Sequence, residues 1–174
     1  EVDRGEAQLA GRLAFEFRDP EPRFDRARRV RGPVARLVRV KDPNAATALE
    51  VAAGGKLYQV VVDTEQTGKL LLEKGKLKKR VTIIPLNKIS RPRIGDDKVA
   101  RARDVAAEQG GTATPALELV GYEEDVAAAM EYAFGTAFVC DSLEVAKAVA
   151  FDRGVRTRAV TLEGDSFEPA GTLT

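Results

Sequence analysis

Two stretches of this sequence repeat the same order of segments. In each, a short apolar stretch precedes a helical run that ends at glycine, a strand that ends at aspartate, a second helical run and a last strand. The first copy covers residues 34–40, 44–53, 60–62, 64–74 and 81–84, and the second covers 116–120, 123–134, 137–140, 142–152 and 158–162. Such a repeat predicts a duplicated unit, so residues 34–86 and 117–163 should superpose as βαβαβ-like halves.

The residue types within each copy favour alternating helices and strands. The apolar residues of 126–134 recur at the spacing of a helix that is buried on one side. The Val-Val-Val run at 60–62 is typical of a strand that helices cover on both faces. The predicted fold class is therefore α/β, with two pseudo-repeated subdomains built on helix-flanked mixed sheets.

Four residues occupy matching places in the two copies and invite a structural interpretation. Gly54 and Gly135 follow helical runs, where a left-handed C-cap favours glycine. The Gly-Gly-Lys string at 54–56 is then a helix end rather than a phosphate site, because the dipole there repels anions. Asp63 and Asp141 each follow a strand, as in receiver domains or metal sites, but capping of the next helix explains both.

The predicted domain boundaries follow from this pattern. Residues 1–32 form a lead-in helix and an extended loop, 33–90 the first subdomain, 91–115 a connector with a short helix over 98–108, and 116–174 the second subdomain. Because the chain begins with Glu1 rather than Met, we expect it to be part of a longer protein. No apolar run approaches the ~18 residues of a membrane span, so no membrane contact is expected.

The composition argues against an enzyme. The chain has no histidine, which excludes a Ser-His-Asp triad, a Cys-His pair and a histidine-bearing zinc site within it. No phosphate-binding loop of the form G-x-x-x-x-G-K-[ST] is present. The single cysteine, Cys140, lies in an apolar strand and is interpreted as core packing rather than a reactive thiol. The acidic trio at 123–125 suits the first turn of a helix better than a metal site. We therefore expect no catalytic, cofactor-binding or metal-ligating residues.

The charges are strongly segregated along the chain. Residues 69–103 carry 12 basic and 3 acidic groups, whereas residues 104–174 carry 4 and 13. This predicts a surface with a positive and a negative pole, unless folding interleaves the two segments. The densest basic cluster comprises Lys74, Lys76, Lys78, Lys79 and Arg80. It is either a phosphate-contacting loop or a merely solvated one, and the lack of interleaved aromatic residues argues against a base-stacking platform.

Four stretches of the sequence closely resemble the hinge domain of the structural maintenance of chromosomes (SMC) family, in the version found in eukaryotic condensin. They are VVVDTE at 60–65, RVTIIPLNKIS at 80–90, FGTAFVCD at 134–141 and VTLEGDSFEPAGTL at 160–173. The likeness covers residues 33–174, whereas the first thirty residues match poorly. It implies a non-enzymatic hinge of two α/β halves between coiled-coil arms, with ATP and Mg bound in distant head domains outside this chain.

The resemblance also implies partners and sites. Such hinges pair with a sister SMC hinge through sheet edges and a glycine-rich segment of pattern G-x6-G-x3-G-G. Gly164 and Gly171 match its first two positions, and the last two would follow Thr174. Both glycines could instead serve tight turns.

The role that the resemblance implies is that of a condensin hinge, in the nucleus and on chromosomes and in the cytoplasm for part of the cell cycle. It would form a heterodimer, or a weak homodimer at high concentration, and contact DNA weakly without sequence preference. The alternative function is a small-molecule-binding α/β domain, which nucleotide binding by the purified chain would reveal.

Overall fold

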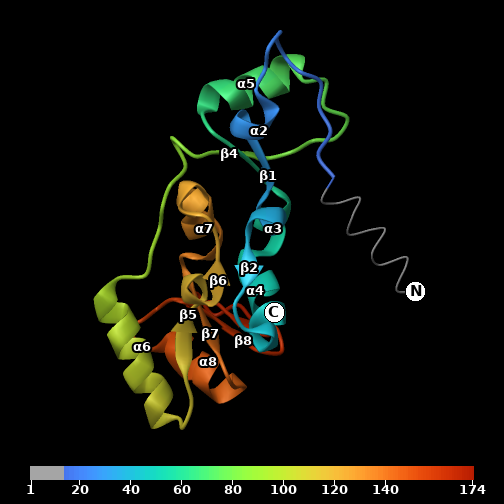
Figure 1. The fold of residues 1–174 in the computed structure, drawn as a ribbon. Helices are drawn as coiled ribbons and strands as arrows, with labels where there is room; N and C mark the ends of the chain where they lie inside the picture. The colour runs from blue at the N-terminus through green and yellow to red at the C-terminus, as the bar shows by residue number, and fades with distance from the viewer. Residues whose placement is uncertain (1–13) are drawn as a thin grey trace, which may run out of the picture.

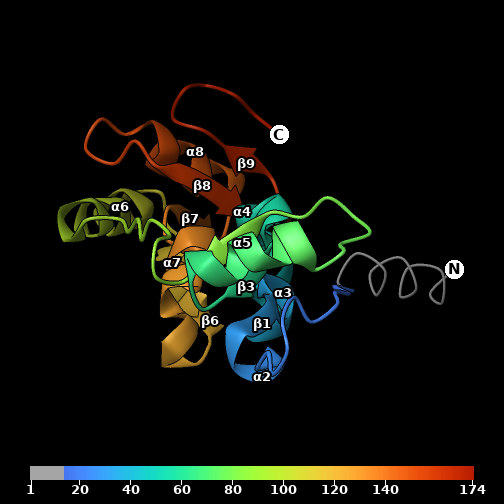
Figure 2. The ribbon, with the colours of Figure 1, turned by 90° about the horizontal axis from the view of Figure 1, so that it is seen from above.

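A computed structural model describes residues 14–174 and contains two α/β units of the same architecture (Figure 1). A connector descends along one side of the molecule and joins the sheet of unit one (residues 30–86) to helix α6, which precedes unit two (residues 113–162). Figure 2 shows the same arrangement from above, with α6 projecting at one side. The predicted mixed α/β fold of two pseudo-repeated halves is confirmed.

Unit one has a three-stranded sheet in the order β1-β3-β4. Strand β3 pairs antiparallel with β1 and parallel with β4. In chain order the elements are α2 (Arg26–Arg29), β1 (Val30–Pro33), α3 (Val34–Leu37), β2 (Arg39–Val40), η1 (Pro43–Ala45), α4 (Ala46–Ala53), η2 (Gly54–Tyr58), β3 (Val60–Val62), α5 (Glu65–Lys74) and β4 (Ile83–Pro85).

Unit two repeats this plan and adds one strand, which gives the sheet order β5-β7-β8-β9. Strand β7 pairs antiparallel with β5 and parallel with β8, as β3 does with its two neighbours. The elements are α6 (Asp96–Glu108), β5 (Ala113–Pro115), η3 (Ala116–Leu119), β6 (Val120–Gly121), η4 (Glu124–Val126), α7 (Ala127–Phe134), β7 (Ala137–Cys140), α8 (Leu143–Phe151), β8 (Arg158–Thr161) and β9 (Ser166–Phe167).

A two-stranded ribbon joins the units. Strands β2 and β6 occupy equivalent places in the two copies and pair antiparallel with each other, Arg39 opposite Gly121 and Val40 opposite Val120. This reciprocal register is the one that an approximate two-fold axis between the units requires. Helices α4 and α7, which are also equivalent, pack against each other beside it. The predicted duplication is thus confirmed at the level of topology.

The largest hydrophobic cluster belongs to both units. It combines Val61 and Ile84 of unit one with Met130, Val139 and Val160 of unit two, all of which are buried. The Val-Val-Val strand is buried on both faces as predicted, because Val61 points into this shared core while Val60 and Val62 pack into a smaller cluster under α5. The two halves therefore depend on a common core.

The first strand of each unit lies earlier than the apolar segments suggested. Residues 34–37 form a helical turn and 116–119 a 3₁₀ turn, so the expected strands shrink to β2 and β6. Strand β1 lies in the segment that was expected to be an extended loop, and β5 lies in the connector segment 91–115. Both strands are short and contain proline, and pairing with β3 and β7 rather than local pattern places them. The predicted helix at 98–108 is present as α6. The expected lead-in helix falls largely on residues 1–13, outside the described residues.

Two of the predicted caps differ in the structure. Gly54 ends α4 with a positive φ of 56°, which favours glycine, but its ψ of −135° lies outside the predicted left-handed helical region, and Gly135 ends α7 with an ordinary φ of −73°. The reason for glycine there is steric, since a Cβ would collide with the carbonyl oxygens of Pro92 and Glu131. The prediction that Asp141 caps α8 is wrong, because Ser142 is the cap and Asp141 accepts a hydrogen bond from the Thr112 amide.

Asp63 supports its helix indirectly. The N-cap of α5 is Thr64, whose side chain accepts from the Thr67 amide. The Asp63 carboxylate accepts from the Thr64 amide at 2.7 Å and from the Thr67 hydroxyl at 2.5 Å. The prediction that Asp63 itself caps α5 is therefore wrong, because Thr64 is the cap and Asp63 supports it.

Candidate interface: a basic loop and open sheet edges

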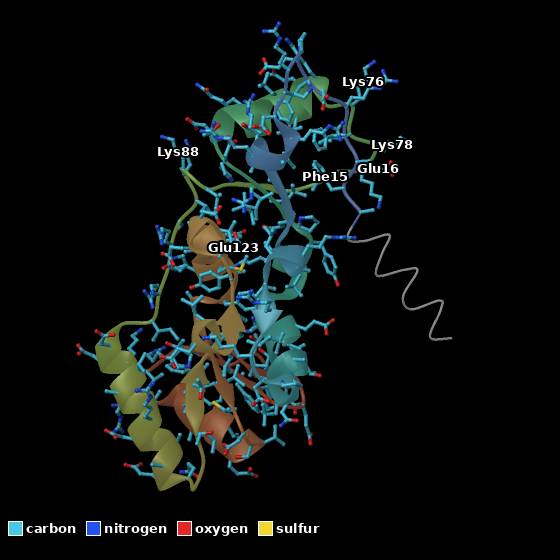
Figure 3. All side chains as sticks on the ribbon, in the orientation of Figure 1. Phe15, Glu16, Lys76, Lys78, Lys88 and Glu123 are labelled. Carbon is cyan, nitrogen blue, oxygen red and sulfur yellow. The ribbon has the colours of Figure 1, made fainter. Side chains whose placement is uncertain are left out.

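The predicted basic cluster lies at one end of unit one, in the turn between α5 and β4. All five of its basic side chains are exposed. Figure 3 shows Lys76 and Lys78 extending outward from the turn, away from the sheet. Lys76 holds a left-handed φ of 49°, which helps to reverse the chain after α5. We call this cluster the basic loop: Lys74, Lys76, Lys78, Lys79 and Arg80.

A groove runs between the basic loop and the N-terminal segment at residues 14–18. It encloses a cavity of about 400 Å³, lined by Phe15 and Glu16 on one side, Lys78 to Val81 on the other and Tyr58 from unit one. The aromatic residues of the N-terminal segment were missed by the sequence analysis. The signal that would have found them is the run of Phe15, Phe17 and Phe24, which pack on the cluster formed by Val60, Val62 and Leu71.

Charge differs between the two units. Unit one carries 11 basic and 5 acidic residues, whereas unit two carries 4 and 8. The segregation along the sequence is kept only in part: the basic loop lies at the far end of the more positive unit (Figure 1), whereas Arg91, Arg93, Arg101 and Arg103 of the same basic segment pair with acidic residues of unit two. Such an arrangement attracts polyanions to one end of the molecule.

Strand β4 is an open edge of the unit-one sheet, with no strand on its outer side among residues 14–174. The Thr82 carbonyl accepts from the Val60 amide at 3.0 Å, and the Leu86 amide donates to the Val62 carbonyl at 2.9 Å. Because successive residues of a strand alternate in direction, the backbone N–H and C=O of Ile83 point away from β3. They are available to a further strand.

The second open edge lies at the C-terminal end of the described chain. Ser166 of β9 and Thr174 exchange backbone hydrogen bonds of 2.9 and 3.0 Å, and Phe167 bridges to Leu173. Residues 172–174 thus extend the unit-two sheet by one more short strand, whose outer side has no partner strand in the described part of the chain. Both sheets thus have an open edge on the side opposite β1 and β5, their first strands.

Gly164 and Gly171 both lie in tight turns next to this edge. Their φ angles are 99° and 102°, which favour glycine. A Cβ on Gly164 would contact Thr47 and Val51 of α4, whereas a Cβ on Gly171 would meet open space. The turn interpretation accounts for both conformations, and only Gly171 presents its α-carbon to the exterior.

Cys140 and the acidic trio at 123–125, the other residues considered in the sequence analysis, have contacts that explain them structurally. Cys140 is buried in β7, and burial together with Asp141 raises the pKa of its thiol from 9.0 to about 12. Of the acidic trio, Asp125 pairs with Arg31 of β1. Residues 14–174 contain no group of side chains able to hold a metal ion. None of the helices described has both the length and the apolar composition needed to cross a bilayer.

Two groups of polar contacts fix unit two, one to the connector and one to unit one. The nearly buried carboxylate of Glu131 on α7 pairs with Arg91 and Arg93 of the connector. The same carboxylate raises the pKa of Arg91 through a hydrogen bond and its charge. On the other side, Arg158 of β8 donates to the carbonyls of Val51 and Ala52 at the end of α4. No local sequence pattern predicts these contacts, because the partners of each pair lie far apart along the chain.

Comparison with known proteins decides the family. Residues 27–150 match the model of the family described as the SMC proteins flexible hinge domain. The chain belongs to the SMC hinge family. It is 53% identical over 172 residues to structural maintenance of chromosomes protein 2-2 of Arabidopsis thaliana, covering 97% of this chain and 14% of that protein. It is 55% identical over 161 residues to structural maintenance of chromosomes protein 2 of Xenopus laevis, covering 92% of this chain and 13% of that protein. This hinge therefore spans about one seventh of these relatives.

Solved SMC hinges have the same fold. The hinge domain of the Pyrococcus furiosus SMC protein matches with a TM-score of 0.65 at 29% identity, covering 89% of this chain and 81% of that one. The Geobacillus stearothermophilus SMC hinge domain, described as an asymmetric dimer, matches with a TM-score of 0.65 at 28% identity, covering 82% and 55% of the two chains. The predicted resemblance to SMC hinges, in the version of structural maintenance of chromosomes protein 2, is confirmed.

Proposed function

We propose that this hinge is the non-enzymatic dimerisation domain of a condensin SMC subunit, which joins that subunit to its sister SMC subunit and contacts DNA during chromosome condensation and segregation. Membership of the hinge family supports the dimerisation role, as does the dimer formed by the related Geobacillus hinge. Any ATP and Mg chemistry belongs to head domains of the full-length protein. The proposed location is the nucleus and chromosomes, and the cytoplasm for part of the cell cycle.

The observation that carries this proposal is the open edge at β4. A strand edge with free N–H and C=O groups binds another strand through backbone hydrogen bonds. Since the β4 side of unit one and the β9 side of unit two each have such an edge, two hinges can meet at two contacts and close a ring. The second contact is intramolecular once the first has formed, so two weak contacts reinforce each other. The preferred partner is the sister condensin hinge, and self-pairing is expected only at high concentration.

The edge is tested by removing one outward donor. Ile83→Pro deletes the N–H that points away from β3, whereas Ile83→Ala loses a comparable part of the side chain and keeps the N–H. Mixed with the sister condensin hinge, the alanine variant should form the heterodimer in light scattering, and the proline variant should not. Equal heterodimer from both variants, each with a wild-type circular dichroism spectrum, would show that β4 is not the contact.

The glycines of the proposed dimer interface, Gly164 and Gly171, need separate tests. A bulky residue at Gly164 would collide with α4 of its own chain. Loss of pairing by such a variant could therefore come from a distorted fold as well as from a blocked interface. Gly171 is open, although its positive φ strains any other residue. Gly171→Asn tolerates that backbone and adds a side chain at the turn. Reduced heterodimer from Gly171→Asn supports its place in the interface, whereas unchanged pairing would assign both glycines to turns alone.

DNA contact is assigned to the basic loop, with Lys76, Lys78, Lys79 and Arg80 as phosphate ligands and Lys74 at its margin. Exposure and local charge density support this assignment. Replacing the four by Glu should weaken binding of a labelled DNA duplex and flatten its salt dependence, because fewer counterions are released.

The matched control for this experiment reverses four exposed basic residues elsewhere: Lys41, Lys147, Arg153 and Arg156. This control changes the net charge by the same amount as the basic-loop variant. It should weaken DNA binding less than that variant does, and its affinity should keep more of the wild-type dependence on salt concentration. If the two quadruple variants lose the same affinity and slope, the basic loop has no special role.

A further inference from the structure

The chain segment at residues 14–18 lies across the mouth of the groove beside the basic loop. We call this segment the strap. Figure 3 shows Phe15 and Glu16 next to the part of the basic loop that carries Lys78. The strap therefore places a competing carboxylate, that of Glu16, beside the exposed ammonium group of Lys78.

The contacts that hold the strap lie mainly at Phe17 and Arg18, where Arg26 donates to the Phe17 carbonyl at 2.9 Å and its guanidinium group lies 4.2 Å from the centre of the Phe17 ring. The Arg18 amide donates to the Gly75 carbonyl at 2.8 Å, and the Glu16 carboxylate lies 3.8 Å from the Lys78 ammonium group. The rings of Phe15 and Phe17 are only half-buried, whereas Phe24, farther along, is 8% exposed. The segment is thus fixed from Phe17 to Phe24, and residues 14–16 are held more lightly.

Unit two provides an internal comparison. There α6 has the equivalent place, before the first strand and next to the helix and loop that correspond to α5 and the basic loop. Arg101 of α6 binds Asp152, which follows α8, through two hydrogen bonds of 2.9 and 3.1 Å. In unit one the strap meets the basic loop through the backbone hydrogen bond of Arg18 with Gly75 and the longer pair of Glu16 with Lys78, and both side chains of that pair are more than three-quarters exposed. The same position is therefore closed firmly in unit two and loosely in unit one.

We propose that the strap is a displaceable cover of the basic loop, in which the Glu16 carboxylate occupies Lys78 until the phosphates of DNA replace it. This regulation rests on the proposed DNA contact. An exposed pair of this length contributes little to stability, so a polyanion that offers several phosphates outcompetes one carboxylate. Release of the strap adds Lys78 to the phosphate-binding surface and opens the groove beneath Phe15.

The first test neutralises the carboxylate. Glu16→Gln removes the competing charge, and Glu123→Gln changes the net charge equally at an exposed side chain on unit two, away from the basic loop (Figure 3). In anisotropy titrations with a short labelled DNA duplex at low salt, Glu16→Gln should bind on the order of threefold more tightly than Glu123→Gln. Its plot of log K against log salt should also be steeper, by up to about 0.9, because one more phosphate is contacted.

The second test follows the strap itself. Hydrogen exchange at the Arg18 amide reports its hydrogen bond to Gly75. Addition of the DNA duplex should increase exchange at this amide in the wild-type chain, while amides of β7 in unit two keep their protection. Unchanged or slower exchange at Arg18 in the DNA complex would mean that DNA binds without moving the strap.

The outcomes separate the two proposals. If the wild-type chain binds DNA and Glu16→Gln matches Glu123→Gln, the strap does not cover the site, although the DNA contact stands. If the wild-type chain and both variants leave the duplex unbound at low salt, the DNA contact itself is wrong and the cover has no role.

Discussion

At the scale of single residues, the structure gives different reasons for residues that look equivalent in sequence. Gly54 is needed for its backbone conformation, whereas Gly135 is needed because the connector carbonyl of Pro92 lies where a Cβ would be. Sequence analysis explained both glycines as helix caps and could not foresee the steric requirement at Gly135. The path of the connector over α7 is set by long-range contacts that leave no local pattern.

Gly135→Ala should therefore be strongly destabilising. The added methyl group collides with two carbonyl oxygens of the backbone, which cannot rotate away, and we expect a loss of about 2–4 kcal/mol in the free energy of unfolding. Gly55→Ala is the control, because its Cβ would meet open space, and it should change stability by less than about 0.5 kcal/mol. Urea unfolding followed by circular dichroism measures both. Equal midpoints for the two variants would contradict the steric explanation.

Cys140 should be unreactive in the folded chain. Burial in β7 raises the pKa of its thiol to about 12, so almost no thiolate exists near neutral pH. A thiol reagent such as Ellman's should react with it only after unfolding in guanidinium. Because the native state keeps this proton between pH 9 and about 12 while the unfolded state releases it, this group lowers stability as the pH rises through that window. Rapid native-state labelling at pH 8 would contradict the buried position.

At the scale of elements, regular helices were predictable and short strands were not. The helices α4, α5, α7 and α8 follow apolar periodicity that is visible in the sequence, and α5 and α8 also have the polar N-caps Thr64 and Ser142. Strands β1 and β5 have only three or four residues and gain their place from hydrogen bonds to β3 and β7. Contacts between elements from different units, such as that of Arg158 with α4, were equally invisible.

Arg158 should be a key connection between β8 and α4. Its guanidinium group satisfies two carbonyls at the end of α4 and also contacts Ser166 and Glu168. Arg158→Met removes these hydrogen bonds while keeping much of the side-chain volume, and it should cost about 2 kcal/mol. Arg158→Lys keeps the charge but lacks the planar fork, so its urea midpoint should fall between those of the wild type and Arg158→Met. A lysine variant as stable as the wild type would show that charge alone suffices.

At the scale of the whole molecule, the shared core makes the two units interdependent. The cluster around Met130 includes buried side chains from α4, β3 and β4 of unit one and from α7, β7 and β8 of unit two. The duplication, the α/β class and the position of the basic loop could be predicted from sequence. The strap was not predicted, because the alternation of Phe15 and Phe17 is too short to define an element, and contacts with α5 and β3 place both side chains.

The domain should consequently unfold as one cooperative unit. Met130→Ala leaves a cavity in the shared core and should lower stability by about 2–5 kcal/mol. Hydrogen exchange of the β3 amides in unit one and of the β7 amides in unit two should accelerate by the same factor. Leu72→Ala, at a side chain that is 62% exposed, is the control and should leave both sets nearly unchanged. Acceleration confined to unit two would show that the halves unfold independently.

The reciprocal pairing of β2 with β6 has an evolutionary consequence. Each strand makes to the other the contacts that it receives, which is the pattern of an isologous interface between two identical subunits. A single ancestral unit could have formed this interface as a homodimer, and fusion through the connector then made the association independent of concentration. Once fused, the two copies no longer had to remain identical. Unit one accumulated basic residues and the loosely held strap, while unit two became acidic and acquired an additional strand.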